Sequence, residues 1–443
     1  MGNEVKRWNR YSRVSLADNK TDAGGRLFLS GLGQVDLSRV HVLHSGLDTV
    51  RQLYTGTLQP DVLAEVSRIY NDGFGECLEL GGHVWLLGSG GKSGYQYRLQ
   101  NSDLGLIVFL KSRYVDVLQE GSHVKIECSP HWLYPRGIEA MGAELDALAK
   151  VFLTGLRPSG CAVHLCCDIQ GWGPGADFLD RLVTRARRFV SHRSSKVVYV
   201  DTGEIATSYN EGQSYLLGSA SSVQMAVYRK DIQAKVMDKL DFWRNIWSQA
   251  CGVDFTDTLY DETMPVWRVE FRFHHSVLAD FGRGAASQME YGFTVEQERW
   301  SHITGVSGHL QGLWSYGLTN FRLELVGEGV GRYLDPVWQL LLEDIMHSAP
   351  VGDIFYKRVK KTPGVGSEKN LMLAVGNLLS LYARHGFSVD YSMQCLKGCG
   401  IYDDLYNYMN NRAHRRQEIF SESQIRQFVE KSLLVRRLLG RAA

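Results

Sequence analysis

Long apolar runs are missing from this sequence of 443 residues, and no stretch approaches the 18 uninterrupted apolar residues of a membrane-spanning helix. The first twenty residues are polar and lack the apolar segment of a secretory signal. Proline is scarce at 9 residues, and contents of 44% hydrophobic and 22% charged residues exclude a fibrous or disordered chain. We therefore expect a globular, cytoplasmic protein that has no membrane partner.

Paired cysteines of the kind that bind zinc are also missing. The chain has 8 cysteines, and its close pair, Cys395 and Cys399, has neither a second cysteine pair nor a histidine pair to complete a site. Cys166 and Cys167 are adjacent in the sequence. We expect reduced thiols, as in a cytosolic protein, and no zinc site.

A phosphate loop is absent as well, although GSGGKSG at 88–94 looks like one. Such a loop requires a glycine five residues before Gly91, where this sequence has Leu86, and it must be followed by a helix. The residues that follow, YQYRL, alternate as a strand does. We predict a glycine-rich hairpin here and no ATP-driven helicase.

Charge of one sign is concentrated locally, although the formal net charge is only +1. Residues 351–443 hold fifteen lysines and arginines against eight acidic residues, and residues 181–196 hold six basic residues and no acid. Basic patches on a near-neutral protein are typical of a site-specific nucleic-acid enzyme. A solvated helix face explains the charge alone equally well.

The order of apolar patterns predicts an α+β fold. Short apolar runs separated by glycine, such as HVWLLG and HVKIEC, predict strands and hairpins. Apolar residues spaced by three and four predict a helix over 138–152, a second helix over 177–190 and a long one over about 230–250. Strands lie between them, so we expect an antiparallel-rich sheet with helices packed on one face and a mostly helical C-terminal domain.

Three regions follow from these patterns. Residues 1–35 are polar and glycine-rich, and we expect a loose N-terminal arm there. Residues 36–330 would form the sheet domain, and residues 331–443 a basic helical domain, with KRVKKTPGVGSEK as the link into it.

Three carboxylates interrupt apolar strands. In WRVEFRFH, alternation places Arg268, Glu270 and Arg272 on one face, and a carboxylate flanked by guanidinium groups suits a site for a divalent ion and a phosphate. A solvated edge strand has the same pattern. Asp168 ends the strand VHLCCD, where a turn or helix cap is the alternative, and Glu127 in HVKIEC is either a third ligand or a surface residue.

Tyr228 ends the strand SVQMAVY and is followed by Arg229 and Lys230. A phenol has a reference pKa near 10, so it becomes a nucleophile only when cations or a metal ion stabilise the phenolate. The alternative is an ordinary aromatic side chain at a strand end, since the chain has 21 tyrosines.

Three segments, in this order, resemble the replication initiation factor family, which comprises the Rep-trans type of rolling-circle replication initiators of plasmids and some phages and related relaxases. They are CCDIQGW at 166–172, SYLLGSASSVQMAVYRKD at 214–231 and WRVEFRF at 267–273. The resemblance covers roughly residues 35–300. The chain has no His-hydrophobic-His triplet of the HUH endonucleases, which agrees with an acidic metal site.

The resemblance implies a metal-dependent endonuclease that nicks origin DNA. Tyr228 would attack a phosphodiester and become linked to the 5′-phosphate, with later rejoining of the strands. Lys230, Arg268 and Arg272 would assist, while Asp168, Glu270 and Glu127 would hold Mg²⁺ or Mn²⁺. Phosphate contacts would come from the basic segment and its residues Arg181, Arg185, Arg187, Arg188, Arg193 and Lys196.

The implied role is the initiation of rolling-circle replication, with origin DNA and a host helicase as partners; homodimerisation is left open. Two alternatives remain at this point. A relaxase that starts conjugative transfer of a mobile element would share the site and differ in its transfer origin. A non-catalytic DNA-binding regulator would keep the sheet and bind DNA in a salt-sensitive manner without forming a covalent adduct.

Overall fold

The computed structural model describes residues 9–14, 25–72, 77–186, 189–193, 196–197, 214–251, 257–286, 299–327, 331–349, 356, 358, 368–415 and 420–438. The chain divides into two compact units, Met1–Val359 and Lys360–Ala443. Within the described part, no helix is both long and apolar enough to cross a membrane.

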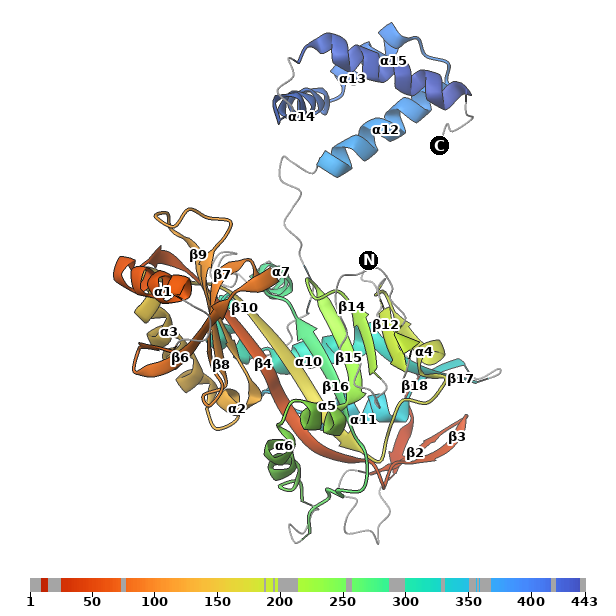
Figure 1. Ribbon diagram of the computed structural model, residues 1–443. Coiled ribbons are helices and arrows are strands. Elements are labelled where there is room, and N and C mark those ends of the chain that lie inside the picture. Colours follow the sequence, from red (N-terminus) through yellow and green to blue (C-terminus); the bar gives the residue numbers. More distant parts are fainter. Residues whose placement is uncertain are drawn as a thin grey trace. The chain divides into compact units, whose positions relative to one another are not determined.

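A twelve-stranded antiparallel sheet forms the core of the first unit (Figure 1). Its strand order is β13-β12-β14-β15-β16-β10-β4-β9-β8-β7-β6-β5. The strands are β4 (His41–Leu58), β5 (Cys77–Leu80), β6 (His83–Ser89), β7 (Tyr95–Asn101), β8 (Leu106–Ser112), β9 (Gly121–Cys128), β10 (Leu153–Gln170), β12 (Phe189–Arg193), β13 (Lys196–Val197), β14 (Ser214–Gly218), β15 (Val223–Arg229) and β16 (Val266–Phe273). The α+β prediction is confirmed, and the segment 88–94 joins β6 to β7 as the expected hairpin through the short 3₁₀ helix Gly91–Ser93.

Alternation along β16 separates an apolar face of the sheet from a polar one. Val269 and Phe271 are fully buried on the apolar face, where the Phe271 ring lies 5.2 Å from that of Trp314 in α10 (Leu310–Asn320). Arg268 and Glu270 alternate with them and therefore project from the opposite face. The polar positions predicted for this strand thus share one face.

The helices of the first unit connect and cover these strands. They are α1 (Pro60–Asp72), α2 (Pro130–Leu133), α3 (Ile138–Phe152), α4 (Phe178–Arg181), α5 (Lys230–Val236), α6 (Leu240–Trp247), α7 (His275–Ala286), α9 (Ile303–Ser307), α10 and α11 (Pro336–Asp344). The helix predicted over 138–152 has those limits, with Met141, Leu145 and Phe152 buried. On the polar face, α6 lies against β16, because its Trp243 ring stacks 4.3 Å from the Arg268 guanidinium carbon.

Two predicted helices are wrong. The segment 177–190 is helical only in α4; β11 (Leu182–Thr184) then pairs with β17 (Phe321–Gly327), and β12 pairs with β14. Pairing with strands distant in the sequence overrides the helical spacing of its apolar residues. The helix predicted over 230–250 is divided into α5 and α6 at Asp238, whose φ of 53° is left-handed and ends the first helix.

The described part of the predicted N-terminal arm is ordered. β1 (Ser12–Val14), β2 (Leu27–Ser30) and β3 (Gly33–Asp36) form a three-stranded antiparallel sheet. Tyr11 is buried beside it, and the Arg13 guanidinium pairs with Asp344 of α11 at 2.6 Å. Tertiary contacts therefore order part of a segment that has no periodic pattern of its own.

The second unit contains the helices α12 (Glu368–Arg384), α13 (Val389–Gly398), α14 (Tyr402–Arg415) and α15 (Glu422–Leu438). Its core includes the fully buried residues Leu379, Leu396 and Val429. The boundary lies at 359/360, later than the predicted 330/331. β18 (Gly331–Leu334) and α11 belong to the first unit, because β18 pairs with β17 and Trp338 is buried in the main core.

We expect Gly317→Ala to destabilise the first unit by about 1–3 kcal/mol, the usual effect of overpacking a core. A Cβ atom at Gly317 would lie 2.6 Å from Cγ of the buried Phe271 ring, so ring or helix must shift. Tryptophan fluorescence during urea titration reports this unit alone, since all 10 tryptophans precede residue 339.

Gly88→Ala is the matched control for this substitution. Its new Cβ would be 3.6 Å from the Arg98 side chain, which is an ordinary van der Waals contact. We expect the urea midpoint of this variant to equal that of the wild type within experimental error. Equal midpoint shifts for both variants would contradict the close packing of α10 on β16.

Candidate active site

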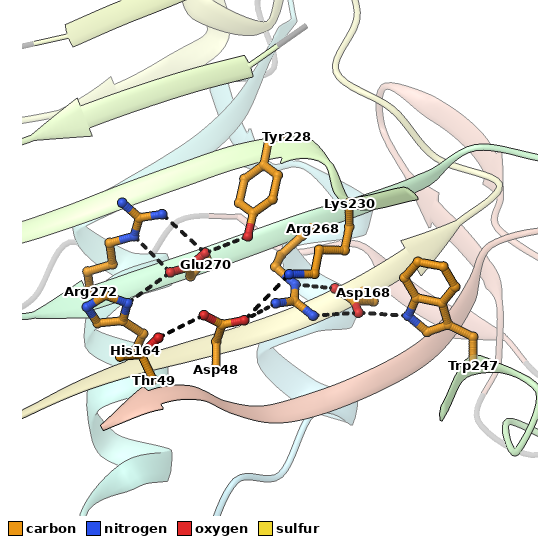
Figure 2. A network of polar contacts seen from close by, with 10 residues as sticks. All are labelled: Asp48, Thr49, His164, Asp168, Tyr228, Lys230, Trp247, Arg268, Glu270 and Arg272. Atoms are coloured by element: carbon orange, nitrogen blue, oxygen red, sulfur yellow. Dashed lines mark hydrogen bonds and ion pairs between the residues drawn. The ribbon is translucent and has the colours of Figure 1, made fainter. Parts of the chain in front are cut away.

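Polar side chains from four neighbouring strands meet on the polar face of the large sheet (Figure 2). Arg268 of β16 is paired in register with Asp168 of β10 on one side and with Tyr228 of β15 on the other. Because directly opposed residues of antiparallel strands project to the same face, these three side chains are neighbours.

Arg268 is fully buried and ties three strands together. Its Nε donates to Oδ1 of Asp168 at 2.6 Å and one Nη donates to Oδ2 at 2.8 Å, while the other Nη donates to Asp48 of β4. Trp247 Nε1 also donates to Oδ2 of Asp168 at 2.8 Å. Burial opposes ionisation of Asp168, but the Arg268 charge outweighs it and lowers the pKa of this carboxyl.

A β-bulge places Asp48 at this site. The pairing of β4 with β10 shifts between His164↔Thr49 and Leu165↔Leu47, so Asp48 is the extra residue on β4. Its second carboxylate oxygen accepts from Thr49 Oγ1 at 3.0 Å. Burial opposes its ionisation, yet Lys230 and Arg268 hold its pKa below the ordinary value.

Glu270 lies at the centre of the polar contacts and is 1% exposed. It accepts hydrogen bonds from Tyr228 Oη at 2.9 Å and from Arg272 Nε at 2.8 Å, and Nδ1 of His164 lies 3.1 Å from its Oε1. Burial disfavours the charge, but Arg272 and His164 outweigh burial and hold the pKa of Glu270 well below its ordinary value. The carboxylate is therefore ionised.

Asp48, His164 and Glu270 each bring one ligand atom within 4.8 Å of the others. The donor set fits a divalent ion, since both carboxylates are ionised and burial lowers the pKa of His164, which leaves its imidazole neutral. We refer to these three residues as the Asp48 triad. Asp48 keeps a 15% exposed side chain, so the triad is not sealed from solvent.

Tyr228 and Lys230 flank the triad, and the pKa of each is shifted from its ordinary value. Burial and the neighbouring Glu270 raise the pKa of Tyr228 well above its ordinary value, so the phenol is neutral. Burial and the Arg268 charge lower the pKa of Lys230 to about 8. The Lys230 ammonium lies 3.7 Å from Asp48 Oδ1 and 5.9 Å from the centre of the Tyr228 ring.

The structure brings five of the predicted site residues together and separates others. Glu270 is a member of the triad, and Tyr228, Lys230, Arg268 and Arg272 lie around it. The sixth, Asp168, is within the same network, but Arg268 and Trp247 occupy both of its oxygens, so it orients Arg268 and is outside the triad.

Glu127 lies outside the triad too. On β9 it pairs with Lys125 at 2.8 Å and with Arg51 at 3.2 Å. These two cations satisfy its charge, which is the usual arrangement on a partly exposed strand. The structure therefore gives Glu127 a role as a cross-strand ion-pair partner.

The predicted basic segment is dispersed over several elements. Arg181 is tied to Asp335, which caps α11, while Arg185 is exposed just after β11. Arg193 and Lys196 lie on β12 and β13 and are paired across the two strands. Arg187 and Arg188 lie outside the described residues.

Sequence reasoning missed two members of the triad. His164 had a usable signal, because it precedes Asp168 by four residues on one strand and so shares its face. Asp48 had no such signal in the sequence, because a β-bulge decides which way its side chain points. Alternation along a strand does not reveal a bulge.

Comparison with known proteins adds a phage relative. The chain is 37% identical over 369 residues to the uncharacterized protein ORF430 of Pseudomonas phage Pf1, covering 81% of this chain and 82% of the relative. The chain belongs to the family of ORF430. No family model matches the chain. This family thus includes a phage protein.

The lowered pKa of Lys230 makes a prediction about stability. Below about pH 8 the buried ammonium is charged in the folded and unfolded states, and its burial destabilises the fold; the cost is relieved as the pH rises towards 10.5. Relative to Lys230→Met, the wild type should gain on the order of 3 kcal/mol of unfolding free energy over that interval. Urea titrations followed by tryptophan fluorescence would measure it.

Comparison of the two proteins at each pH removes the contribution of other titrating groups, such as the buried cysteines. Tyr228→Phe serves as a second reference, because it keeps Lys230 and should retain the wild-type slope up to about pH 9, below the pH at which an exposed phenol ionises. A difference between wild type and Lys230→Met that stays constant with pH would contradict a buried, shifted ammonium.

Proposed function

We propose that this protein initiates rolling-circle replication by nicking origin DNA through Tyr228 with the help of a divalent ion, Mn²⁺ or Mg²⁺. One observation carries the proposal: the Tyr228 hydroxyl lies 2.9 Å from Glu270, a member of the Asp48 triad. A nucleophile beside ionised ligands and basic side chains is the arrangement that phosphoryl transfer requires.

The proposed step is a transesterification. The Tyr228 oxygen attacks the phosphorus, a tyrosyl–phosphorus bond forms, and the bond from phosphorus to the 3′-oxygen breaks. The phenol proton leaves along the hydrogen bond towards Glu270 and on to solvent, and the departing 3′-oxygen gains a proton. Bond energy is conserved in the 5′-phosphotyrosine, so the reverse step rejoins strands without ATP.

Charge in the site explains the roles of its basic residues. Three carboxylates, Asp48, Asp168 and Glu270, are opposed by Lys230, Arg268 and Arg272. A divalent ion held by the triad would supply the extra positive charge that favours the phenolate and polarises the phosphate. Arg272, whose side chain is 33% exposed, is the guanidinium that DNA can reach, while Arg268 is fully buried and positions Asp48.

The phage relative supports this proposal in a limited way. ORF430 is a protein of a phage, and the family that the three sequence segments resemble includes initiators of some phages. A relaxase would share the same chemistry, and it would act at a transfer origin instead of a replication origin.

Tyr228→Phe should abolish the covalent adduct with single-stranded origin DNA while DNA binding persists, because the substitution removes only the attacking oxygen. The adduct is measured on denaturing gels after incubation with Mn²⁺, and the linked peptide is identified by mass spectrometry. We expect a loss of at least about a thousandfold, as for removal of a nucleophile.

Tyr97→Phe is the control, since Tyr97 lies on β7 of the same sheet, away from the triad. Its hydroxyl lies 2.9 Å from that of Ser67 in α1. This variant should form the adduct normally. An adduct of undiminished yield in Tyr228→Phe would end the nucleophile assignment, and DNA binding without any adduct in the wild type would favour a regulator.

Metal binding can be tested without DNA. A mixed carboxylate and imidazole set favours Mn²⁺ over Mg²⁺, because Mg²⁺ prefers oxygen ligands alone. Asp48→Asn should weaken Mn²⁺ binding at least tenfold, measured by the electron paramagnetic resonance signal of free Mn²⁺, and Glu127→Gln should leave it unchanged. Unchanged Mn²⁺ binding in Asp48→Asn and weakened binding in Glu127→Gln would place the ion site at β9 instead.

A further inference from the structure

A second candidate site lies at the other end of the β14–β15 hairpin from Tyr228. A hollow of about 300 Å³ is bordered by the turn Gly218–Ser222, by Arg185 after β11, by Tyr316 and Phe321 near the end of α10, and by Arg358. It has the volume of a small ligand pocket. None of the residues in the Asp48 triad lines it.

The turn that forms one wall has a fixed geometry. Gly218 has a φ of +95°, and a Cβ there would lie 2.3 Å from the Val223 carbonyl oxygen, so the position requires glycine. Ser222 N donates to Ser219 O at 2.9 Å, and His274 N donates to Ser222 O at 3.1 Å. The Ser219 and Ser222 hydroxyls are therefore held at the edge of the hollow.

Two guanidinium groups make the hollow electropositive. Arg358 donates to Ser222 Oγ at 3.2 Å and to Asp280 at 3.0 Å, and its Nε is buried without a hydrogen-bond partner in the described structure. Asp280 also pairs with Arg283. Arg185 is exposed and forms no ion pair with any described residue. The Arg185 charge is therefore not neutralised by a carboxylate among the described residues that border the hollow.

Aromatic and apolar side chains border the hollow as well. They are Tyr316, Phe321, which is 4% exposed, and Val223, which is 8% exposed. Aromatic faces beside guanidinium groups are the combination with which proteins bind a base and its phosphate. Neither kind of group alone would specify a nucleotide.

We propose that this hollow binds a nucleotide unit, with its phosphate against Arg185, Arg358 and the Ser222 hydroxyl and its base against Tyr316 and Phe321. The unit comes from one of two sources with the same chemistry, a DNA strand or a free nucleotide. The site is separate from the Asp48 triad, and binding there does not depend on the nicking reaction.

Arg185→Gln tests this proposal with little risk to folding, because the side chain is exposed and has no ion-pair partner among the described residues. Arg98→Gln is the matched control: Arg98 is also exposed and lies on β7, far from the β14–β15 turn in the strand order. The probes are a fluorescent 12-residue single-stranded oligodeoxynucleotide and free dTMP.

If the source is a DNA strand, Arg185→Gln should weaken oligonucleotide binding about threefold to tenfold. The slope of the logarithm of the binding constant against the logarithm of the salt concentration should become shallower by about 0.7, the value for one phosphate contact on a single strand. Binding is followed by fluorescence anisotropy at several salt concentrations. If the source is a free nucleotide, dTMP should raise the melting temperature of wild type and Arg98→Gln and leave that of Arg185→Gln unchanged.

The proposal is overturned if Arg185→Gln and Arg98→Gln behave alike with both probes. Its failure is separate from failure of the nicking proposal, because the Tyr228 adduct is scored in the same samples at saturating oligonucleotide. A wild type that forms no adduct while showing the Arg185 effect would retain the hollow and lose the nuclease.

Discussion

A single buried guanidinium, that of Arg268, organises the site. Taking this charge out of water is costly, and its pairing with Asp168 and Asp48 repays the cost only because the hydrogen bonds are well aligned. The two carboxylates come from β10 and β4, so the ion pairs cross three adjacent strands. Removing either partner would leave an unpaired charge in the interior. The position of Asp48, and with it the geometry of the Asp48 triad, depends on this arginine.

The balance of charge around Arg268 explains why the Tyr228 phenol keeps its proton in the absence of further positive charge. Glu270 is a weak base, since Arg272 and His164 keep its pKa low, and it is hydrogen-bonded to a phenol whose pKa burial has raised. The proton therefore stays on Tyr228. Added positive charge at the triad and the anionic phosphate of a substrate would change this balance together. In the proposed reaction, Tyr228 would therefore remain protonated until both the ion and the substrate are bound.

Local periodicity predicted the parts of this structure that local sequence controls. Alternation in the β16 segment placed Arg268, Glu270 and Arg272 on one face, and the 3.6-residue period gave α3 its limits. Long-range pairing decided the rest. Leu182–Thr184 became a strand because β17, about 140 residues later, pairs with it, and Asp48 reached the site through a bulge opposite β10. Neither partner strand is visible from the segment itself, so the basic segment was wrongly predicted to be a helix, and Asp48 was not among the predicted site residues.

The β14–β15 hairpin links the two candidate sites mechanically. Tyr228 lies at one end of β15 and Val223, which borders the hollow, at the other, five residues and about 17 Å away at the rise of an extended strand. Pairing with β16 fixes β15 along this whole length, and the glycine-dependent turn fixes its far end. A DNA strand held in the hollow would thus be held at a set distance from Tyr228. In the proposed reaction this hold would select which phosphate meets Tyr228, since Ser222 at the edge of the hollow and Tyr228 belong to the same hairpin.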